Sequence, residues 1–384
     1  MESPGKHAVQ IDQSHYHFGV AQNSLNANVD KASPNKIRFM RLLLKLIRFF
    51  VQLVLSQLDD FFSNRKTQIK VISSLNENKH AAPALIYVHY SSNGILAANE
   101  VSSLKVINSL GFNVYVVINT DSPDDINILN ENIQLNEFAV LAILRRNRGY
   151  DLGAYRDAYT HLSKKGYLET SNILFMNNSV FWIPSKVENY FRLLLNQKLD
   201  IFGSVISYQY RQHIQTYLFG SLTLTGQEKI ENWLLGIKNW RLKRTIVNRG
   251  EISTNSFFSN EINVKSVPSR EALEATSLVT LHEHYIKSDN YVNPEVIERL
   301  QNNRKHRFAS IPQNPSHSNW LELLDCGFPG IKFDLIRKNP SNIPDYEVVI
   351  SELLKCGLTS SEIARLIQDV KISQVAKIRL FLKI

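Results

Sequence analysis

One stretch of this 384-residue chain, residues 139–184, constrains the fold more than any other. It opens with an apolar run of strand length, 139–144, and continues with the polar segment 145–151, after which apolar residues recur at helical spacing. A second apolar run, 173–176, ends in Asn-Asn-Ser at 177–179. Strand, polar loop, helix and strand predict a parallel pair with a right-handed crossover, and both polar clusters then follow the carboxyl ends of strands. We expect the active site at that edge.

Strands and helices also alternate upstream of this stretch. Apolar runs at 84–89 and 112–119 predict buried strands, and 95–110 has helical spacing and stops at a glycine. The polar residues 64–83 are interpreted as a lead-in without a strand of their own. The alternation predicts an α/β fold, a Rossmann-type, mostly parallel sheet with helices on both faces.

Composition narrows the partners and the compartment. Hydrophobic residues make up 43% of the chain and charged residues 21%, which excludes general disorder. The net charge of +9 favours an anionic partner: a nucleoside diphosphate, an anionic membrane face or nucleic acid. Cys326 and Cys356 have no metal-ligand spacing and fit a reducing cytosol. The N-terminus has no signal-peptide pattern and no run of 18 apolar residues occurs, so we expect a cytoplasmic protein, soluble or on a membrane surface.

The N-terminal region divides into two parts. Residues 1–34 are polar without periodicity and predict a poorly ordered tail. Residues 35–65 predict an amphipathic basic helix, because between 37 and 62 the polar positions recur every three or four residues and form one stripe: Arg38, Arg41, Lys45, Arg48, Gln52 and Ser56. Such a helix suits the anionic inner face of a cell membrane. The alternative, a helix packed on the catalytic domain with solvated charges, stays open.

Four segments together carry a resemblance to a known family, although each alone is weak: 147–154 (Asn-Arg-Gly-Tyr-Asp-Leu-Gly-Ala), 176–180 (Met-Asn-Asn-Ser-Val), 200–203 with 213–217 (Asp-Ile-Phe-Gly and His-Ile-Gln-Thr-Tyr), and 327–340 (Gly-Phe-Pro-Gly-Ile-Lys-Phe-Asp-Leu-Ile-Arg-Lys-Asn-Pro). In this order, the chain resembles the rhamnan synthesis protein F family of bacterial polysaccharide glycosyltransferases, and more broadly the nucleotide-sugar half of a GT-A glycosyltransferase.

The resemblance implies a GT-A-like glycosyltransferase domain over residues 84–345, followed by C-terminal helices over 346–384. It implies a hexosyltransferase that moves a rhamnose- or galactofuranose-like sugar from a nucleoside-diphosphate donor. The acceptor would be a cell-surface polysaccharide or lipopolysaccharide, glycan-like or lipid-linked, and the displacement would be inverting.

Donor-binding candidates lie at the strand ends and in the matching segments. Asp121 follows the second strand, where GT-A enzymes carry an acid that reads the base, and Asp151 also suits the N-terminus of a helix. The full set of candidates is Asp121, Asn147, Arg148, Gly149, Asp151, Asn177, Asn178, Ser179, His213, Lys332 and Arg337.

The tip at 177–179 departs from the family, which usually has Asn-Asp-Ser there. Divalent cations prefer anionic oxygen ligands, and Asn and Ser offer neutral ones. We therefore predict no metal ligands and no cofactor. The leaving diphosphate would be neutralised by cationic candidates instead, namely Arg148, His213, Lys332 and Arg337, each of which has an ordinary surface charge as its alternative.

Attack on the anomeric carbon needs a base that takes the acceptor proton. Glu251, in Arg-Gly-Glu-Ile-Ser past the sheet, lies where related enzymes place such an acid, and a solvent-exposed loop glutamate is the alternative. Asp200 and Asp151 are the next candidates.

Two other classes of function stay open. Residues 353–367 have the pattern of a helix-turn-helix with a glycine in its turn, although a helical hairpin packed on the main domain is favoured, and no nucleic-acid partner is expected. A non-catalytic module that binds a sugar nucleotide or glycan is favoured by the missing carboxylate at 177–179.

Overall fold

The computed structural model describes residues 34–363, apart from 64–68, 75, 77, 80, 122, 124–126, 170–171, 198, 208–211, 259–263, 267–313, 319, 339–345, 356–357 and 362. The chain divides into two compact units, Met1–Phe61 and Phe62–Ile384. The tail predicted over 1–34 lies almost wholly outside the described residues. The helix predicted over 37–62 is confirmed as α2 (Pro34–Phe62). Within the described residues, no helix combines the length and hydropathy needed to cross a membrane.

The second unit is built on a sheet of eight strands among the described residues, in the order β1-β4-β3-β2-β5-β10-β7-β11. Their bounds are β1 Ile69–Ser74, β2 Ala84–Tyr90, β3 Asn113–Thr120, β4 Ala139–Arg146, β5 Ile173–Asn177, β7 Ile201–Gly203, β10 Leu218–Ser221 and β11 Val264–Ser266. The central strands β4, β3, β2 and β5 are mutually parallel, whereas β1 and β10 run antiparallel to their neighbours. The predicted α/β fold with a mostly parallel sheet is confirmed.

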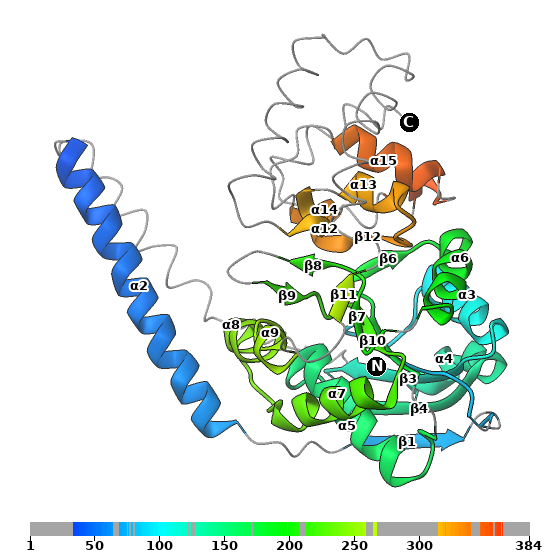
Figure 1. Ribbon diagram of the computed structural model, residues 1–384. Helices are drawn as coiled ribbons and strands as arrows, with labels where there is room; N and C mark the ends of the chain where they lie inside the picture. Colours follow the sequence, from blue (N-terminus) through cyan, green and yellow to red (C-terminus); the bar gives the residue numbers. More distant parts are fainter. Residues whose placement is uncertain are drawn as a thin grey trace, which may run out of the picture. The chain divides into compact units, whose positions relative to one another are not determined.

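Helices cover both faces of this sheet (Figure 1). Side chains alternate along each strand, so Leu85 and Tyr87 of β2 belong to one apolar core and Ile86 and Val88 to the other. The first core is covered by α3 (Ala98–Ser109) and α6 (Pro184–Leu195), and the second by α5 (Tyr150–Lys164) and α7 (Leu224–Gly236). Because both faces are buried, the central strands read as continuous apolar runs.

Shorter elements complete the unit. They are α4 (Asn127–Glu131), η2 (Ile133–Glu137), β8 (Ile206–Ser207), β9 (His213–Ile214), α8 (Lys243–Ile246), the π-helical turn η3 (Val247–Glu251), α9 (Thr254–Phe257) and α12 (Pro315–Ser318). The pair β8–β9 is antiparallel and separate from the main sheet.

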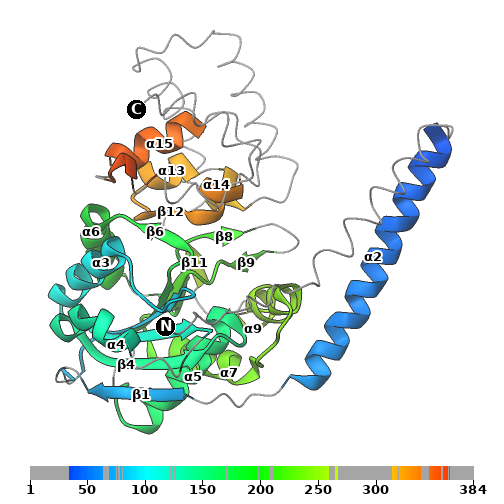
Figure 2. The same ribbon diagram turned by 180° about the vertical axis from the view of Figure 1, so that it is seen from behind.

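A third core lies beyond the carboxyl edge of β5. Strand β6 (Val180–Trp182) pairs antiparallel with β12 (Gly330–Lys332), and three helices pack on this pair: α13 (Trp320–Asp325), α14 (Phe333–Lys338) and α15 (Tyr346–Lys355) (Figure 2). Leu353 of α15 is buried there with Leu358 and Ile363. The helical segment starting at 346 is therefore packed on the main domain. Most of the remaining segment predicted to be helical, from 356 to 384, lies outside the described residues.

Two expectations were wrong. Residues 69–74 form the edge strand β1, which pairs antiparallel with β4, and are not only a polar lead-in, because Ile69, Val71 and Ile72 give the segment strand character. The strands at 139–144 and 173–176 are parallel but not adjacent, since β3 and β2 lie between them. Consequently, the chain reverses its direction of travel across the sheet between β2 and β5. Ligands of open α/β sheets bind at such a switch point, outside the carboxyl ends of the strands.

Candidate functional site

A buried arginine shapes the loop between β4 and α5. Arg145 is fully buried and donates through Nη1 to Asn119 Oδ1 (2.6 Å) and through Nη2 to the Arg148 carbonyl (2.7 Å) and Asp157 Oδ2 (2.9 Å). Arg156, also buried, donates to Asp157 Oδ1 through Nε at 2.9 Å and to the Ile237 carbonyl at 2.7 Å. Arg145, Arg156 and Asp157, here called the arginine clamp, thus fix the loop to the start of α5.

Two glycines let this loop pack closely. Gly149 has a φ of +70°, and its N–H donates to the Trp240 carbonyl at 3.2 Å. A Cβ on Gly153 would come within 2.7 Å of the Arg148 carbonyl oxygen. The donor contact predicted for Gly149 stays a prediction. The structure shows that this position needs glycine for its backbone conformation, which L side chains rarely adopt.

The first turn of α5 meets η3 directly. A Cβ on Gly250 would lie 2.3 Å from Leu152 Cδ1, so any larger residue there would force the Leu152 side chain or η3 to shift. Asp151 and Glu251 flank the contact, one on each element. Single-turn π-helical segments occur frequently at functional sites. The approach explains why the charge of Glu251 acts on Asp151.

A chain of hydrogen bonds links Glu251 to β9 and β12. Thr254 Oγ1 donates to the Glu251 carbonyl (2.7 Å) and accepts from the Ile214 N–H (3.1 Å). The next residue, Gln215, accepts through Oε1 from Lys332 Nζ at 3.2 Å. Lys332 Nζ also lies 5.1 Å from the centre of the Tyr217 ring. Asp151, Glu251 and Lys332, from three separate segments, lie close enough for their charges to act on one another, and we name them the lysine–carboxylate cluster.

The ionisation of all three members is shifted. Burial raises the pKa of Asp151 to about 6, and the charge of Glu251 raises it further. Burial also raises the pKa of Glu251, while the charges of Lys332 and Lys243 oppose that rise. The pKa of Lys332 is lowered by burial, although Glu251, Asp334 and Asp151 favour its charged form. Half-buried titratable groups whose pKa values move toward neutrality are typical of acid–base sites.

The tip at 177–179 is held by hydrogen bonds within the protein. Asn177 donates through Nδ2 to Asp151 Oδ2 (2.6 Å) and accepts through Oδ1 from the backbone N–H (2.9 Å) and Oγ (2.7 Å) of Ser179. Asn178 exchanges hydrogen bonds with the backbone of Tyr90, with Nδ2 donating to the carbonyl (2.9 Å) and Oδ1 accepting from the N–H (3.1 Å). Asn178 thereby extends the pairing of β2 with β5, which an aspartate lacking the amide donor could not do.

A second polar group lies at the ends of β2, β3 and β4. Burial raises the pKa of the Tyr90 phenol, the negative charge of Asp121 raises it further, and a hydrogen bond to Asn147 opposes the rise. Tyr90 is 45% exposed and Tyr150, at the start of α5, is 38% exposed. Two predicted donor-binding residues, Asp121 and Asn147, therefore meet at an accessible tyrosine that the sequence did not single out.

The remaining predicted residues differ in environment. Arg148 is exposed, and His213 is buried, with its Nε2 2.9 Å from Gln215 Nε2. Arg337 belongs to α14, and its side chain lies outside what the structure describes. Among the described residues, no three His, Cys, Asp or Glu side chains gather as metal ligands would. Asp200, the reserve base, accepts a hydrogen bond from Thr223 Oγ1 at 2.7 Å.

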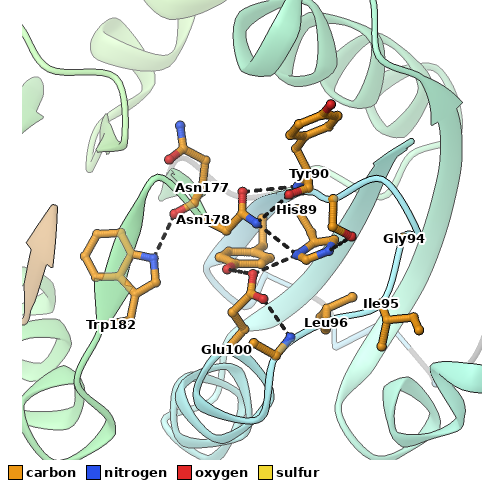
Figure 3. A network of polar contacts seen from close by, with 12 residues as sticks. His89, Tyr90, Gly94, Ile95, Leu96, Glu100, Asn177, Asn178 and Trp182 are labelled. Atoms are coloured by element: carbon orange, nitrogen blue, oxygen red, sulfur yellow. Dashed lines mark hydrogen bonds and ion pairs between the residues drawn. The ribbon is translucent and has the colours of Figure 1, made fainter. Parts of the chain in front are cut away.

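Sequence inspection missed a buried network at the switch point (Figure 3). His89 at the end of β2 and Glu100 in the first turn of α3 are joined through Nδ1 and Oε1 at 2.8 Å. Tyr87 Oη donates to the same Glu100 oxygen at 2.5 Å, and Asn178 Nδ2 lies 3.1 Å from His89 Nδ1. His89 was hidden in an apolar strand pattern and Glu100 in a helical one.

Fold and site define an α/β protein with a charged, half-buried site at the carboxyl edge of a mostly parallel sheet. No family model matches the chain. Virulence protein VirA of Vibrio anguillarum is 26% identical over 216 residues, which make up 55% of this chain and 67% of that protein. A solved structure, the mannosyltransferase PcManGT of Pyrobaculum calidifontis in complex with GDP-Man and Mn²⁺, is 12% identical and aligns with 88% of this chain and 91% of its own. The TM-score of that alignment is 0.25, too low to support an inference, so the fold assignment rests on the strand order itself.

Proposed function

We propose that this protein is a glycosyltransferase that uses a nucleoside-diphosphate sugar. The observation that carries the proposal is the lysine–carboxylate cluster, formed by residues about 100 and 180 positions apart along the chain at the carboxyl edge of the sheet. Such a transfer needs a base near the acceptor hydroxyl and positive charge near the leaving diphosphate, and the cluster contains both kinds of group.

Glu251 is the proposed base. Burial raises its pKa, which makes it a stronger proton acceptor than an ordinary glutamate. Turnover should therefore fall as the pH drops through this raised pKa. Lys332 is the proposed partner of the departing diphosphate. Lys243 is a second cation of this region, because its charge acts on both Glu251 and Lys332.

The nucleotide end of the donor is assigned to the group around Asp121 and Asn147. These side chains lie at the ends of β3 and β4, next to the exposed Tyr90. Carboxylate and amide groups can read the edge of a base or the ribose hydroxyls. Arg148 and Arg337 stay candidate phosphate contacts, as predicted from the matching segments.

The finer assignment follows the resemblance to the rhamnan synthesis protein F family. It gives a GT-A-like, inverting hexosyltransferase with a rhamnose- or galactofuranose-like donor and a cell-surface polysaccharide or lipopolysaccharide acceptor.

The decisive experiment incubates the purified full-length chain with a panel of nucleoside-diphosphate sugars and measures the release of nucleoside diphosphate. Faster release with one donor than with the others supports the proposal. If no donor binds or reacts while the protein binds duplex DNA at physiological salt, the assignment to glycosyltransferases is wrong.

A binding module without catalysis is the second candidate, favoured by the hydrogen bonds that already occupy Asn177 and Ser179. It predicts that a nucleotide sugar binds to the wild-type chain without turnover. Glu251→Gln would then leave the measured properties unchanged.

We further propose that α2 binds the anionic inner face of the membrane. Large apolar side chains along this helix are exposed, including Leu42 (56%), Phe50 (60%) and Val54 (56%). The basic positions form one stripe of the sequence, and each basic residue adds about 1 kcal/mol of attraction to an anionic leaflet, which salt weakens. Soluble proteins rarely leave such an apolar face in water.

Cosedimentation with phosphatidylglycerol vesicles tests the membrane proposal, with pure phosphatidylcholine vesicles as the control. The full-length chain should sediment with the anionic vesicles and be partly released by high salt, whereas a chain starting at Lys66 should stay folded and unbound. Unfolding or aggregation of that shortened chain would make α2 part of the core and contradict the membrane assignment.

A further inference from the structure

A hydroxyl, an imidazole and a carboxylate form a hydrogen-bonded chain at the end of β2. Ser91 Oγ lies 2.8 Å from His89 Nε2, and His89 Nδ1 lies 2.8 Å from Glu100 Oε1 (His89 and Glu100 in Figure 3). A nucleophile next to a base that is oriented by a third group is the arrangement that activates serine for attack on carbonyl carbon.

The partners of Glu100 determine which nitrogen of His89 carries the proton. The carboxylate also accepts from Tyr87 Oη (2.5 Å) and from the Ala97 N–H (2.7 Å). An ionised carboxylate can only accept, so His89 Nδ1 must donate to it. In the neutral ring, Nε2 is then an acceptor, and the Ser91 hydroxyl donates to it.

The three side chains differ in exposure in the way that attack by a serine hydroxyl requires. His89 is 2% exposed and Glu100 is 4% exposed, so water does not compete for their hydrogen bond. Ser91 is half-buried and is followed by the exposed residues Ser92 and Asn93. The base and the orienting carboxylate are therefore shielded, whereas the hydroxyl borders the solvent.

The position of the imidazole is fixed by its surroundings. Asn178 Nδ2, which donates to the Tyr90 carbonyl at 2.9 Å, lies 3.1 Å from His89 Nδ1; with the ring proton on Nδ1 this is a packing contact from the side of β5 and not a hydrogen bond. Glu100 holds the same nitrogen from α3. A ring restrained in this way keeps Nε2 directed at Ser91, as a general base must be before the substrate arrives.

We propose that Ser91 is the nucleophile of a second active site, one that takes carboxylic esters. The Ser91 oxygen forms a bond with the carbonyl carbon while its proton passes to His89 Nε2, and the ester C–O bond then breaks. His89 returns the proton to the departing alkoxide, which leaves as an alcohol. Water, activated by the same nitrogen, releases the acyl group as a carboxylic acid and restores Ser91.

This site uses other reacting groups than the proposed sugar transfer, although it adjoins the predicted donor-binding residues through Tyr90 and Asn178. Ser91, His89 and Glu100 belong neither to the lysine–carboxylate cluster nor to the predicted donor-binding residues. Loss of ester chemistry and loss of sugar transfer can therefore be observed separately in the same preparation.

A fluorophosphonate probe tests the proposal on the full-length chain. Attack by Ser91 forms a P–O bond, fluoride leaves, and the serine proton goes to His89. Mass spectrometry of the digested wild-type chain should locate the adduct on Ser91. Ser91→Ala should abolish labelling, and Ser92→Ala, the matched control on the next residue, should keep it.

His89→Gln should slow labelling by about 10²-fold or more, because the base is lost. Hydrolysis of p-nitrophenyl acetate should likewise be lost in Ser91→Ala, slowed in His89→Gln and retained in Ser92→Ala. Circular dichroism checks that each variant is folded, and the mapping on the wild-type chain holds even if His89→Gln does not fold. A folded wild-type chain that stays unlabelled, or an adduct on another residue, would overturn the proposal.

Discussion

Two charged clusters share helix α5, which carries Asp151 of one and Arg156 and Asp157 of the other, and they differ in how burial is compensated. In the arginine clamp, Asp157 accepts from two guanidinium groups at 2.9 Å or less, and Arg145 and Arg156 also donate to backbone carbonyls. In the lysine–carboxylate cluster, burial moves the pKa values of all three members toward neutrality, whereas burial lowers the pKa of Arg145 in the clamp only to about 10, so its guanidinium stays charged. The clamp stabilises a conformation, whereas the cluster holds charge in an environment that disfavours it.

The difference separates structural from functional charge. Paired and hydrogen-bonded buried charges contribute mostly by avoiding the cost of an uncompensated partner. Groups with shifted pKa values cost stability and are retained where they serve binding or catalysis. Perturbation of each cluster should therefore affect different properties of the protein.

The largest effect is expected from Arg145→Met. The substitution removes one partner of Asp157 and leaves the Arg148 carbonyl and Asn119 without their donor, so the free energy of unfolding should fall by about 3–5 kcal/mol. Urea denaturation measures it, with exposed Arg146→Met as the matched control. A loss below about 1 kcal/mol would show that Arg156 alone maintains the clamp.

Glu251→Gln tests the other cluster. The substitution keeps shape and hydrogen bonding but removes the base, so kcat should fall by about 10²-fold while donor binding and the melting temperature change little. Exposed Glu228→Gln is the control. If kcat is unchanged, Glu251 is not the base, and Asp151 becomes the next candidate.

Asp151→Asn should affect stability in a pH-dependent way. Because the pKa of Asp151 rises from 3.8 to about 6 on folding, the folded state binds more protons between these values. The free energy of unfolding therefore falls as the pH rises through this window and stays lower above it. Asparagine carries no charge and can still accept from Asn177 Nδ2, so the variant lacks this fall.

The variant should melt a few degrees higher than the wild type at pH 7.5 and at a similar temperature at pH 4. Thermal melts across pH 4–8 measure the difference, and exposed Asp325→Asn should show no such trend. Donor affinity of Asp151→Asn should decrease at the same time. A variant that is less stable at every pH would place Asp151 with the structural charges.

Much of this fold could be predicted from the sequence because the central strands are buried on both faces. The apolar runs ending near 89, 119, 144 and 176 mark β2, β3, β4 and β5, and the polar residues after them do lie at the carboxyl edge. Strand β1 was missed because its apolar residues, Ile69, Val71 and Ile72, are few and lie inside the otherwise polar stretch 64–83.

The sequence predicted which residues belong to the candidate site better than it predicted which of them interact. Asp151, Glu251 and Lys332 were each singled out, but only the approach of Gly250 to Leu152 shows that the first two interact. Arg145 was passed over in a run of three arginines, because sequence cannot separate the buried one from its exposed neighbours. The roles proposed for the donor-binding residues remain predictions.

The smallest effect is expected from metal removal. The side-chain oxygens of Asn177 and Asn178 are neutral and accept hydrogen bonds from Ser179 and Tyr90, whereas a divalent cation prefers anionic oxygens. The lysine–carboxylate cluster supplies its own cation in Lys332, which can neutralise the leaving diphosphate as the base acts.

We therefore expect that excess EDTA leaves turnover within about twofold of its untreated value, whereas Lys332→Met lowers it far more. Turnover is measured with and without EDTA on the donor that the panel identifies, and Lys338→Met, at the end of the following helix α14, serves as the control. Loss of activity with EDTA that Mn²⁺ restores would mean that an ion, rather than Lys332 alone, balances the charge of this cluster. The two clusters would then differ more strongly. The charges of the arginine clamp would be balanced by residues of the chain, whereas those of the lysine–carboxylate cluster would be balanced only with a bound cation.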